Sequence, residues 1–243
     1  MNIIKGGVIC LANIMIFKRV EKKYLINEEE KQALFSLIAD KLVPDKYGRN
    51  TICSLYLDTP DYLLIRNSID AKAYKEKLRI RSYGTPKDDS SVFFEIKKKY
   101  NGIVYKRRVL MTLNQAFEYV DTGIPPMDTQ IMREIDYLMN FYKQPKPNVC
   151  ILCEREAFFA TDNSDVRLTF DENLRYRYGF PNDENVKDGT PIVNEGEYIL
   201  EIKTPGAMPL WLADALSKCK IYPRSFSKYA HAYYDIINKR EKD

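Results

Sequence analysis

The sequence predicts an α+β protein of mostly antiparallel β-structure, a closed eight-stranded tunnel barrel with helices packed outside. Three observations favour this fold. Eight segments have the pattern of strands, and they do not alternate regularly with helices as the strands of a parallel sheet do. Two of these segments flank Asn101-Gly102, a strong signal for a two-residue hairpin. In most of the eight, charged residues alternate with apolar ones, so one face of the sheet carries charge.

The predicted elements form groups of strands separated by helices. A first strand is expected over residues 16–26 and a helix over 28–40, which Asn27 can cap and the three glutamates at 28–30 favour. A strand over 51–58 and a short helix over 60–70, opened by Pro60, come next. The remaining strands are predicted over 76–83, 91–100, 103–111, 150–160, 165–177 and 197–203, and the remaining helices over 113–120, 128–142, 208–218 and 226–239.

The domain organisation is expected to be simple. Residues 15–243 contain no repeat, low-complexity tract or Pro/Gly/Ser-rich linker, which predicts a single domain. Residues 1–14 are mildly apolar, but Lys5, two glycines and Asn13 interrupt them. We expect an N-terminal extension there, because the stretch is too short and broken to span a bilayer. A secretory or lipoprotein segment around Cys10 stays open as the alternative.

Composition indicates a cytoplasmic protein. Net charge is +4, from 38 basic and 34 acidic side chains, which is too little by itself to indicate nucleic-acid binding. The five cysteines have no framework spacing. Cys150 and Cys153 form one CxxC, but they lie in a predicted strand, where positions three apart face opposite sides. We therefore expect reduced thiols and no zinc or disulfide site.

The charged face of the predicted sheet has mostly one sign. Its carboxylates are Glu21, Glu95 and Glu201, and its cations are Arg19, Lys23, Lys77, Arg79, Arg81, Lys97, Lys99, Lys106, Arg108, Arg155, Arg167 and Lys203. A solvated outer face is the simplest interpretation of any one strand. Such a face normally mixes both signs, however, because like charges opposite one another are unfavourable. The apolar residues between them also need cover, so the charged face is predicted to line the barrel.

This excess of enclosed cations predicts an anionic ligand. Buried charges require counter-charges, and three glutamates are too few for these cations. The interior of an eight-stranded barrel admits only a slim molecule, so triphosphate or polyphosphate fits and duplex nucleic acid does not. Arginine binds phosphate oxygens bidentately, and the inward carboxylates could bind Mg²⁺ or Mn²⁺. The chain contains neither a P-loop motif nor a nucleophile–histidine pair.

An ordered set of motifs carries a family resemblance. These motifs are RVEKKYLI (19–26), SLYLDT (54–59), KLRIRSYG (77–84), FFEIKKK (93–99), YKRRV (105–109), EREAF (154–158), RLTFD (167–171), YILEIK (198–203) and SFSKY (225–229). From Phe17 to Tyr234 the chain resembles the VTC domain, the polyphosphate polymerase domain of vacuolar transporter chaperone proteins. That domain is similar to the CYTH proteins, and both are triphosphate tunnel metalloenzymes.

The resemblance implies roles for individual residues. Arg79, Arg81, Lys97 and Lys228 are the expected catalytic residues. The expected phosphate-binding set adds Ser227 and the cations Lys23, Lys106, Arg108, Arg155, Arg167 and Lys203. Glu201 is the expected metal ligand, with Glu21 and Glu95 as further candidates. Cys153 stands where relatives often have a tyrosine, which removes one phosphate-contacting phenol. Asp171 is interpreted as a turn cap or a support for Arg167.

The implied reaction is ATP-dependent extension of polyphosphate with Mn²⁺ or Mg²⁺. Its acceptor phosphate is already ionised, so no general base is required. A metal-dependent triphosphatase is the alternative enzyme, with water oriented by Glu21 or Glu95. A non-catalytic polyanion-binding module is the alternative outside enzymes, and it could dispense with Glu201. No membrane span is expected in this chain, and an unknown membrane partner stays open.

Overall fold

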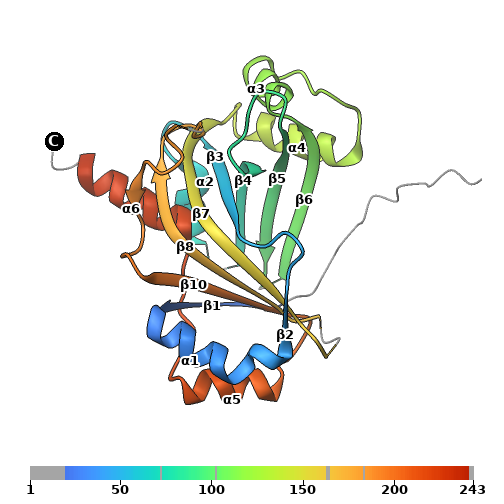
Figure 1. Cartoon of the computed structure of the whole chain (residues 1–243). Helices are drawn as coiled ribbons and strands as arrows, with labels where there is room; N and C mark the ends of the chain where they lie inside the picture. The colour runs from blue at the N-terminus through green and yellow to red at the C-terminus, as the bar shows by residue number, and fades with distance from the viewer. Residues whose placement is uncertain (1–19, 72, 102, 163–164, 183, 241–243) are drawn as a thin grey trace, which may run out of the picture.

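The computed structural model describes residues 20–71, 73–101, 103–162, 165–182 and 184–240 (Figure 1). Its strands are β1 (Val20–Asn27), β2 (Leu42–Pro44), β3 (Asn50–Asp58), β4 (Tyr74–Tyr83), β5 (Ser91–Tyr100), β6 (Ile103–Thr112), β7 (Lys146–Ala160), β8 (Arg167–Arg177), β9 (Thr190–Pro191) and β10 (Glu197–Thr204). Its helices are α1 (Glu28–Ile38), the 3-10 turn η1 (Ala39–Lys41), α2 (Leu63–Asp70), α3 (Leu113–Thr122), α4 (Gln130–Phe141), α5 (Leu210–Lys218) and α6 (Lys228–Arg240).

The eight predicted strands are present, with shifted ends. Two short strands, β2 and β9, were not predicted. The expected extension 1–14 and the first residues of the first strand, including Arg19, lie outside the described residues. The hairpin signal is confirmed, because Tyr100 pairs with Ile103 and leaves a two-residue loop. Asn101 has a φ of 47°, in the left-handed region that asparagine tolerates in such turns.

Capping residues fix where several helices begin. Asn27 forms the predicted cap of α1, since its side chain accepts from the Glu30 amide and the Glu30 carboxylate accepts from the Asn27 amide. Thr112 and Gln115 form the same reciprocal pair at α3. The helix expected from Pro60 begins only at Leu63, because residues 59–62 first form a turn.

The sheet is antiparallel throughout, but strand pairing among the described residues does not close it into a barrel. The long strands pair in the order β1-β10-β8-β7-β3-β4-β5-β6, with β2 added to β7 and β9 to β8. Between β1 and β6, at the two ends of this order, no strand pairing is found in the described ranges, so the predicted hydrogen-bonded closure is not confirmed. The sheet nevertheless curls so strongly that Lys97 Nζ on β5 lies 3.4 Å from Glu21 Oε2 on β1.

The free edge of β1 is covered by the segment that leads from α5 to α6. The Arg224 amide donates to the Lys23 carbonyl at 2.8 Å, and Lys23 Nζ donates to the Phe226 carbonyl at 3.0 Å. Covering an exposed strand edge in this way prevents pairing with other chains. It also brings the start of α6 onto the inner, concave side of the sheet.

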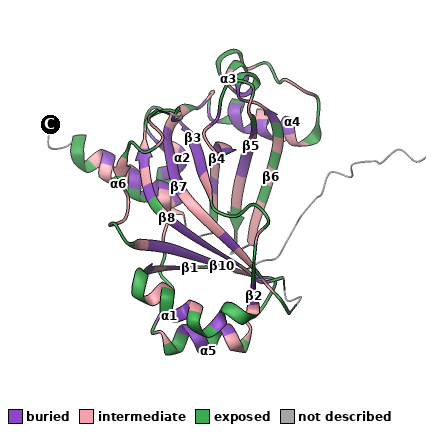
Figure 2. Cartoon of the chain, viewed as in Figure 1, coloured by how far each residue is buried: buried purple, intermediate pink, exposed green. Residues whose placement is uncertain are grey.

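Helices cover the outer face of the sheet in two groups (Figures 1 and 2). α3 and α4 pack on β3, β4 and β5 through buried residues such as Leu55, Phe94 and Tyr119. α1 and α5 pack on β1, β8 and β10 through residues such as Phe170 and Leu200. The charged face is therefore the opposite, inner one, as predicted.

The expectation that every helix lies outside is wrong for α6. Tyr229, Ala232 and Ile236 of α6 pack against Tyr56 and Val149, which lie on the inner face of β3 and β7. The Tyr229 ring stacks on the Tyr56 ring with centroids 4.4 Å apart. One part of the inner face is thus covered by the apolar side of α6, and the charged residues occupy the rest.

Candidate functional site

The inner face gathers almost all of the predicted site residues. Cross-strand register places Lys23 opposite Glu201, Glu201 opposite Thr169, Lys203 opposite Arg167, and Arg155 opposite Asp171. In the other half of the sheet, Arg79 lies opposite Glu95 and Lys97 lies between Lys77 and Lys106. Among the described residues, the site gathers eleven cations of this face, namely Lys23, Lys77, Arg79, Arg81, Lys97, Lys106, Arg108, Arg155, Arg167, Lys203 and Lys228, and four carboxylates, Glu21, Glu95, Asp171 and Glu201.

Glu95 is the centre of a buried ion-pair cluster. Its carboxylate accepts from Arg79 Nε at 2.8 Å and lies 2.6 Å from Lys106 Nζ, and its side chain has no exposed surface. Burial alone would raise its pKa, but Arg79, Arg81 and Lys106 outweigh burial and hold that pKa well below its ordinary value. Glu95 is therefore ionised and held by two cations of the same face.

Tyr56 extends this cluster toward α6. Its hydroxyl accepts from Arg79 Nη1 at 3.2 Å. Burial opposes ionisation of the phenol, yet the charges of Arg79, Lys77 and Arg81 together lower its pKa to about 7. Sequence reasoning missed Tyr56, although strand alternation from Ser54 could have placed it on the inner face. Through its stacking on Tyr229, it connects Arg79 to α6.

Asp171 is the fourth inner carboxylate, and it pairs with Arg155 and Lys228. Arg155 donates to it bidentately, with Nε–Oδ1 2.5 Å and Nη2–Oδ2 2.6 Å, and Lys228 Nζ donates to Oδ2. Neither expected role of Asp171 is found, since Arg167 instead donates to Asp45 at 3.1 Å. Cys153 lies in the same group, with its Sγ 3.4 Å from Lys228 Nζ.

Glu201 and Glu21 lie on adjacent strands near the gap in the sheet. Glu201 Oε1 is 2.9 Å from Lys203 Nζ, and Oε2 is 3.9 Å from Arg155 Nη2. Glu21 lies 3.4 Å from Lys97 Nζ and 3.9 Å from Lys23 Nζ. Burial raises the pKa of Glu201, but Lys203 and Lys23 outweigh it, and the pKa lies well below the ordinary value.

The three candidate metal ligands are not brought together. In the described part of the chain, no group of three or more His, Cys, Asp or Glu side chains could hold a metal ion alone. Glu95 fits a metal poorly, because Arg79 and Lys106 hold its two oxygens at 2.8 and 2.6 Å and its side chain has no exposed surface, whereas Glu201 Oε2 lies 3.9 Å from its cation. Glu21 and Glu201 supply the hard carboxylate oxygens that Mg²⁺ and Mn²⁺ prefer. They fit a divalent ion whose other ligands are phosphate oxygens.

Several inner cations have no carboxylate partner among the described residues. Lys77 Nζ donates to Ser227 Oγ at 2.8 Å, and Arg81 Nε donates to Ser54 Oγ at 3.1 Å. Arg108 stacks on the Phe93 ring, 4.3 Å from its centroid. Burial lowers the pKa of Lys77 to about 8 and also lowers the pKa of Arg81. These groups are held in place but not neutralised, as expected for an anion-binding face.

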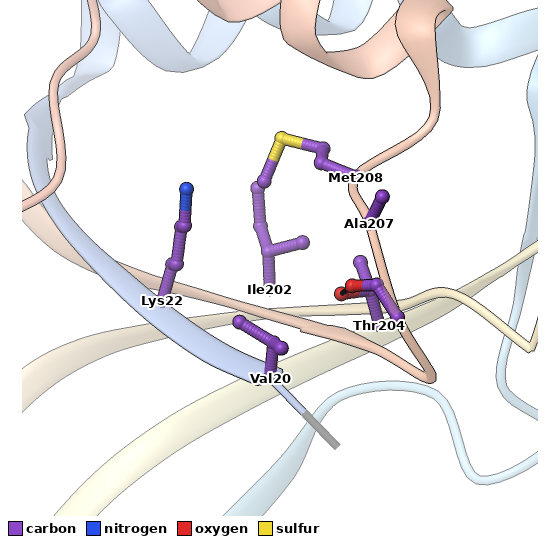
Figure 3. A pocket seen from close by; sticks show the side chains of 7 residues that line it. Val20, Lys22, Ile202, Thr204, Ala207 and Met208 are labelled. Atoms are coloured by element: carbon purple, nitrogen blue, oxygen red, sulfur yellow. Dashed lines mark hydrogen bonds between the residues drawn. The ribbon is translucent and has the colours of Figure 1, made fainter. Parts of the chain in front are cut away.

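A pocket on the outer face is unrelated to these charges. It measures about 270 Å³ and is lined by β1, β10 and the segment that precedes α5 (Figure 3). Its lining residues are Val20, Lys22, Ile202, Thr204, Gly206, Ala207 and Met208, so it contains one charged group. In the described ranges, moreover, each helix is too short or too polar to cross a membrane.

Solved structures resemble this chain to different degrees, all at low sequence identity. A candidate adenylate cyclase from Bacillus halodurans matches with a TM-score of 0.53 and 14% identity, over 86% of this chain and 95% of that one. A candidate adenylate cyclase from Vibrio parahaemolyticus matches with a TM-score of 0.48 and 13% identity, over 89% of this chain and 98% of that one. A candidate adenylyl cyclase from Hippeastrum matches with a TM-score of 0.48 and 14% identity, over 87% of this chain and 92% of that one. That protein is described as revealing a dominant triphosphatase activity. The first likeness shows the fold alone, and the other two are too weak to carry an argument.

Sequence comparison gives the family. No curated protein matches the chain significantly. The pattern of the VTC domain matches residues 18–236, which is nearly the whole chain and agrees with the span of the nine motifs. The chain belongs to the VTC domain family.

Proposed function

We propose that this protein transfers the γ-phosphoryl group of ATP to the end of a polyphosphate chain bound on the inner face. The observation that carries the proposal is the charge of the site on that face, which gathers eleven cations and four carboxylates in the described part of the chain. All four carboxylates are engaged by cations of the face, and several cations remain without one. A polyanion would supply the missing negative charge. Family membership supports a phosphoryl-transfer reaction on triphosphates.

The proposed chemistry rests on alignment and charge neutralisation. Arg79, Arg81, Lys97 and Lys228 would contact the phosphates that react, and the guanidinium groups suit the equatorial oxygens of the transferred group. An acceptor phosphate is already ionised, so its oxygen needs no base. Glu201 and Glu21 would hold Mn²⁺ or Mg²⁺, which neutralises phosphate charge when bound. The remaining inner cations would hold the chain in register.

The arrangement of lysines favours a long polyanion over a single triphosphate. Lys77, Lys97 and Lys106 lie directly opposite one another on three adjacent strands, and Lys75 lies opposite Lys99 further along. Like charges at paired positions repel each other unless an anion lies between them. These pairs continue the charged face beyond Arg79 and Arg81, so they suit a ligand that extends along the strands.

Hydrolysis of triphosphate is the competing enzymatic function. It needs a group to orient water, and Glu95 is a poor candidate because it is fully buried between Arg79 and Lys106. Glu21 stays available for that role. Incubation with ATP and Mn²⁺, followed by gel separation, distinguishes the functions. Long phosphate chains support polymerisation, free phosphate alone supports hydrolysis, and unchanged ATP with tight polyphosphate binding supports a binding module.

The cellular setting proposed for this activity is the cytoplasm. Cys53, Cys150, Cys153 and Cys219 are all free thiols, which suits a reducing compartment. Cys150 packs in the outer core and Cys153 near the inner face, so the two thiols of this CxxC lie on opposite sides of the sheet. ATP and polyphosphate are the partners that the proposal requires.

Tripolyphosphate should stabilise the fold more than a simple salt does. Because the inner cations repel each other, an anion that binds only the folded state raises its stability by mass action, by about 2.7 kcal/mol at a hundred times Kd. We expect the melting temperature to rise by several degrees with tripolyphosphate and clearly less with chloride at equal ionic strength. Equal melting temperatures in the two salts would contradict an anion-binding inner face.

Stability without phosphate should rise between pH 7 and pH 9. Burial lowers the pKa of Lys77 to about 8, although the charge of Tyr56 opposes this shift. Burial likewise lowers the pKa of Lys106 to about 7, although the charge of Glu95 opposes that shift. Unfolded lysines titrate near pH ~10.4, so the unfolded chain binds more protons in this interval. The free energy of unfolding therefore increases with pH. Saturating tripolyphosphate should flatten the profile, because it keeps these lysines protonated.

Urea unfolding at pH 7, 8 and 9, with and without tripolyphosphate, measures both profiles. A free energy of unfolding that falls over this range in phosphate-free buffer would show that the lysines are not desolvated as described.

A further inference from the structure

Two polar atoms on the inner face of β8 are buried without a hydrogen-bond partner. They are Thr169 Oγ1 and Arg167 Nε, and within the described residues no donor or acceptor reaches either atom. Thr169 is only 1% exposed, so solvent does not replace the missing partner. Arg167 is anchored at its other end, where Nη2 donates to Asp45. A buried polar group without a partner costs stability, so each atom calls for an explanation.

The neighbouring strands show why Thr169 lacks a partner. Its register neighbour on β7 is Ala157, whose methyl group can neither donate nor accept. Its register neighbour on β10 is Glu201, whose carboxylate pairs with Lys203 and Arg155. The hydroxyl therefore faces the inner side between a methyl group and an engaged carboxylate.

Strand preference alone does not explain this threonine. Threonine suits strands, but valine has the same shape and an equal preference, and it would avoid a buried hydroxyl. The outer-facing neighbours Leu168 and Phe170 pack in an apolar core, so the strand is otherwise well satisfied. A hydroxyl retained here is explained if it binds a ligand on the inner face.

The character of the ligand follows from the groups around the hydroxyl. Arg167 lies two residues away on the same face of β8, and Lys203 lies opposite Arg167 on β10. Arg167 Nε and Lys203 Nζ are donors, and a threonine hydroxyl can also donate. Three donors at neighbouring register positions of one face suit an acceptor with several anionic oxygens.

We infer that Thr169, Arg167 and Lys203 form a subsite for one phosphate group of the bound chain, in which Thr169 Oγ1 donates a hydrogen bond to a phosphate oxygen. The inference rests on the proposed function in one respect, that the ligand of the inner face is a phosphate chain. Within this subsite Thr169 is a binding residue that adds a neutral donor to the two cations.

Thr169→Val and Thr169→Ser test the subsite, with tripolyphosphate as the probe. Valine keeps the shape and removes the hydroxyl, whereas serine keeps the hydroxyl. In phosphate-free buffer we expect the Thr169→Val protein to melt at the same or a higher temperature, because an unpartnered polar group is lost. Its affinity for tripolyphosphate, measured by calorimetry, should fall about tenfold or more, as for a lost hydrogen bond to a charged group. The serine variant should bind nearly as well as the original protein.

Two results would overturn the subsite. One is unchanged tripolyphosphate affinity in Thr169→Val. The other is a lower melting temperature of free Thr169→Val that serine restores, since the hydroxyl would then have a partner within the fold. The proposed function fails separately: if tripolyphosphate binding depends on Thr169 but ATP yields no chains, the subsite stands and polymerisation does not.

Discussion

Glu201→Gln should abolish turnover while tripolyphosphate still binds. Glutamine keeps the size of the side chain but loses the anionic oxygen that a divalent ion requires. We expect turnover to fall at least about a hundredfold, the scale of losing a charge that stabilises the transition state. Removing one carboxylate from a face of excess cations should leave the affinity for tripolyphosphate equal or higher. Turnover against Mn²⁺ concentration, together with calorimetry, measures both effects.

The simpler role of Glu201 is an internal ion pair with Lys203, 2.9 Å away. In that case Glu201→Gln would leave the Mn²⁺ dependence unchanged and retain substantial activity. Glu134→Gln is a matched control, because Glu134 accepts from Arg107 on the outer face at 3.0 Å. The control should change neither the metal dependence nor turnover.

Arg81→Ala should lower turnover by about a hundredfold to a thousandfold with little loss of stability. The Arg81 guanidinium is partly buried, and its Nε donates to Ser54 Oγ at 3.1 Å. Burial and the charge of Arg79 both lower its pKa, because both disfavour the charged guanidinium. A preorganised charge of this kind contributes about 3–4 kcal/mol to the transition state.

Arg79→Ala should behave differently, although Arg79 lies only two residues away on the same face. Arg79 holds Glu95 through Nε and Nη2, both at 2.8 Å, and the Glu95 carboxylate has no exposed surface. Removing one partner of such a buried pair costs about 3–5 kcal/mol of stability. Arg79→Ala should therefore lose both stability and activity. Adding Glu95→Gln to it should restore stability without restoring turnover.

Circular dichroism, urea unfolding and steady-state turnover of the two variants test this contrast. Arg107→Ala, which removes a cation from the outer face, is the control for general loss of charge. Near-normal turnover in folded Arg81→Ala would remove Arg81 from the site. Equal stability of the two arginine variants would contradict the central position of Glu95.

The sequence predicted the strands and the inner face well, because both depend on local alternation. Period-two patterning decides which face a residue occupies, so Lys23, Arg79, Lys97 and Arg155 could be placed on one face before any pairing was known. Closure could not be predicted in the same way. It depends on whether β1 and β6 meet, and this follows from twist and long-range register instead of local pattern.

The pairing of charges within the site was the least predictable feature. Asp171 was associated with Arg167, four residues before it, but the register of β7 and β8 brings it to Arg155 instead. The inward position of α6 was missed because its aromatic residues are equally compatible with a surface helix. Tyr56 was overlooked for a related reason, since its inner position becomes informative only once Arg79 and Tyr229 are known to contact it.

Determination of the structure with tripolyphosphate and Mn²⁺ bound tests the central claim most directly. We expect phosphate oxygens within hydrogen-bonding distance of Arg81, Lys77 and Arg155 on the inner face, with the metal between Glu201 and the phosphates. Phosphate bound only to outer-face cations such as Lys22 or Arg107, with the inner face free of anions at saturating tripolyphosphate, would contradict the account.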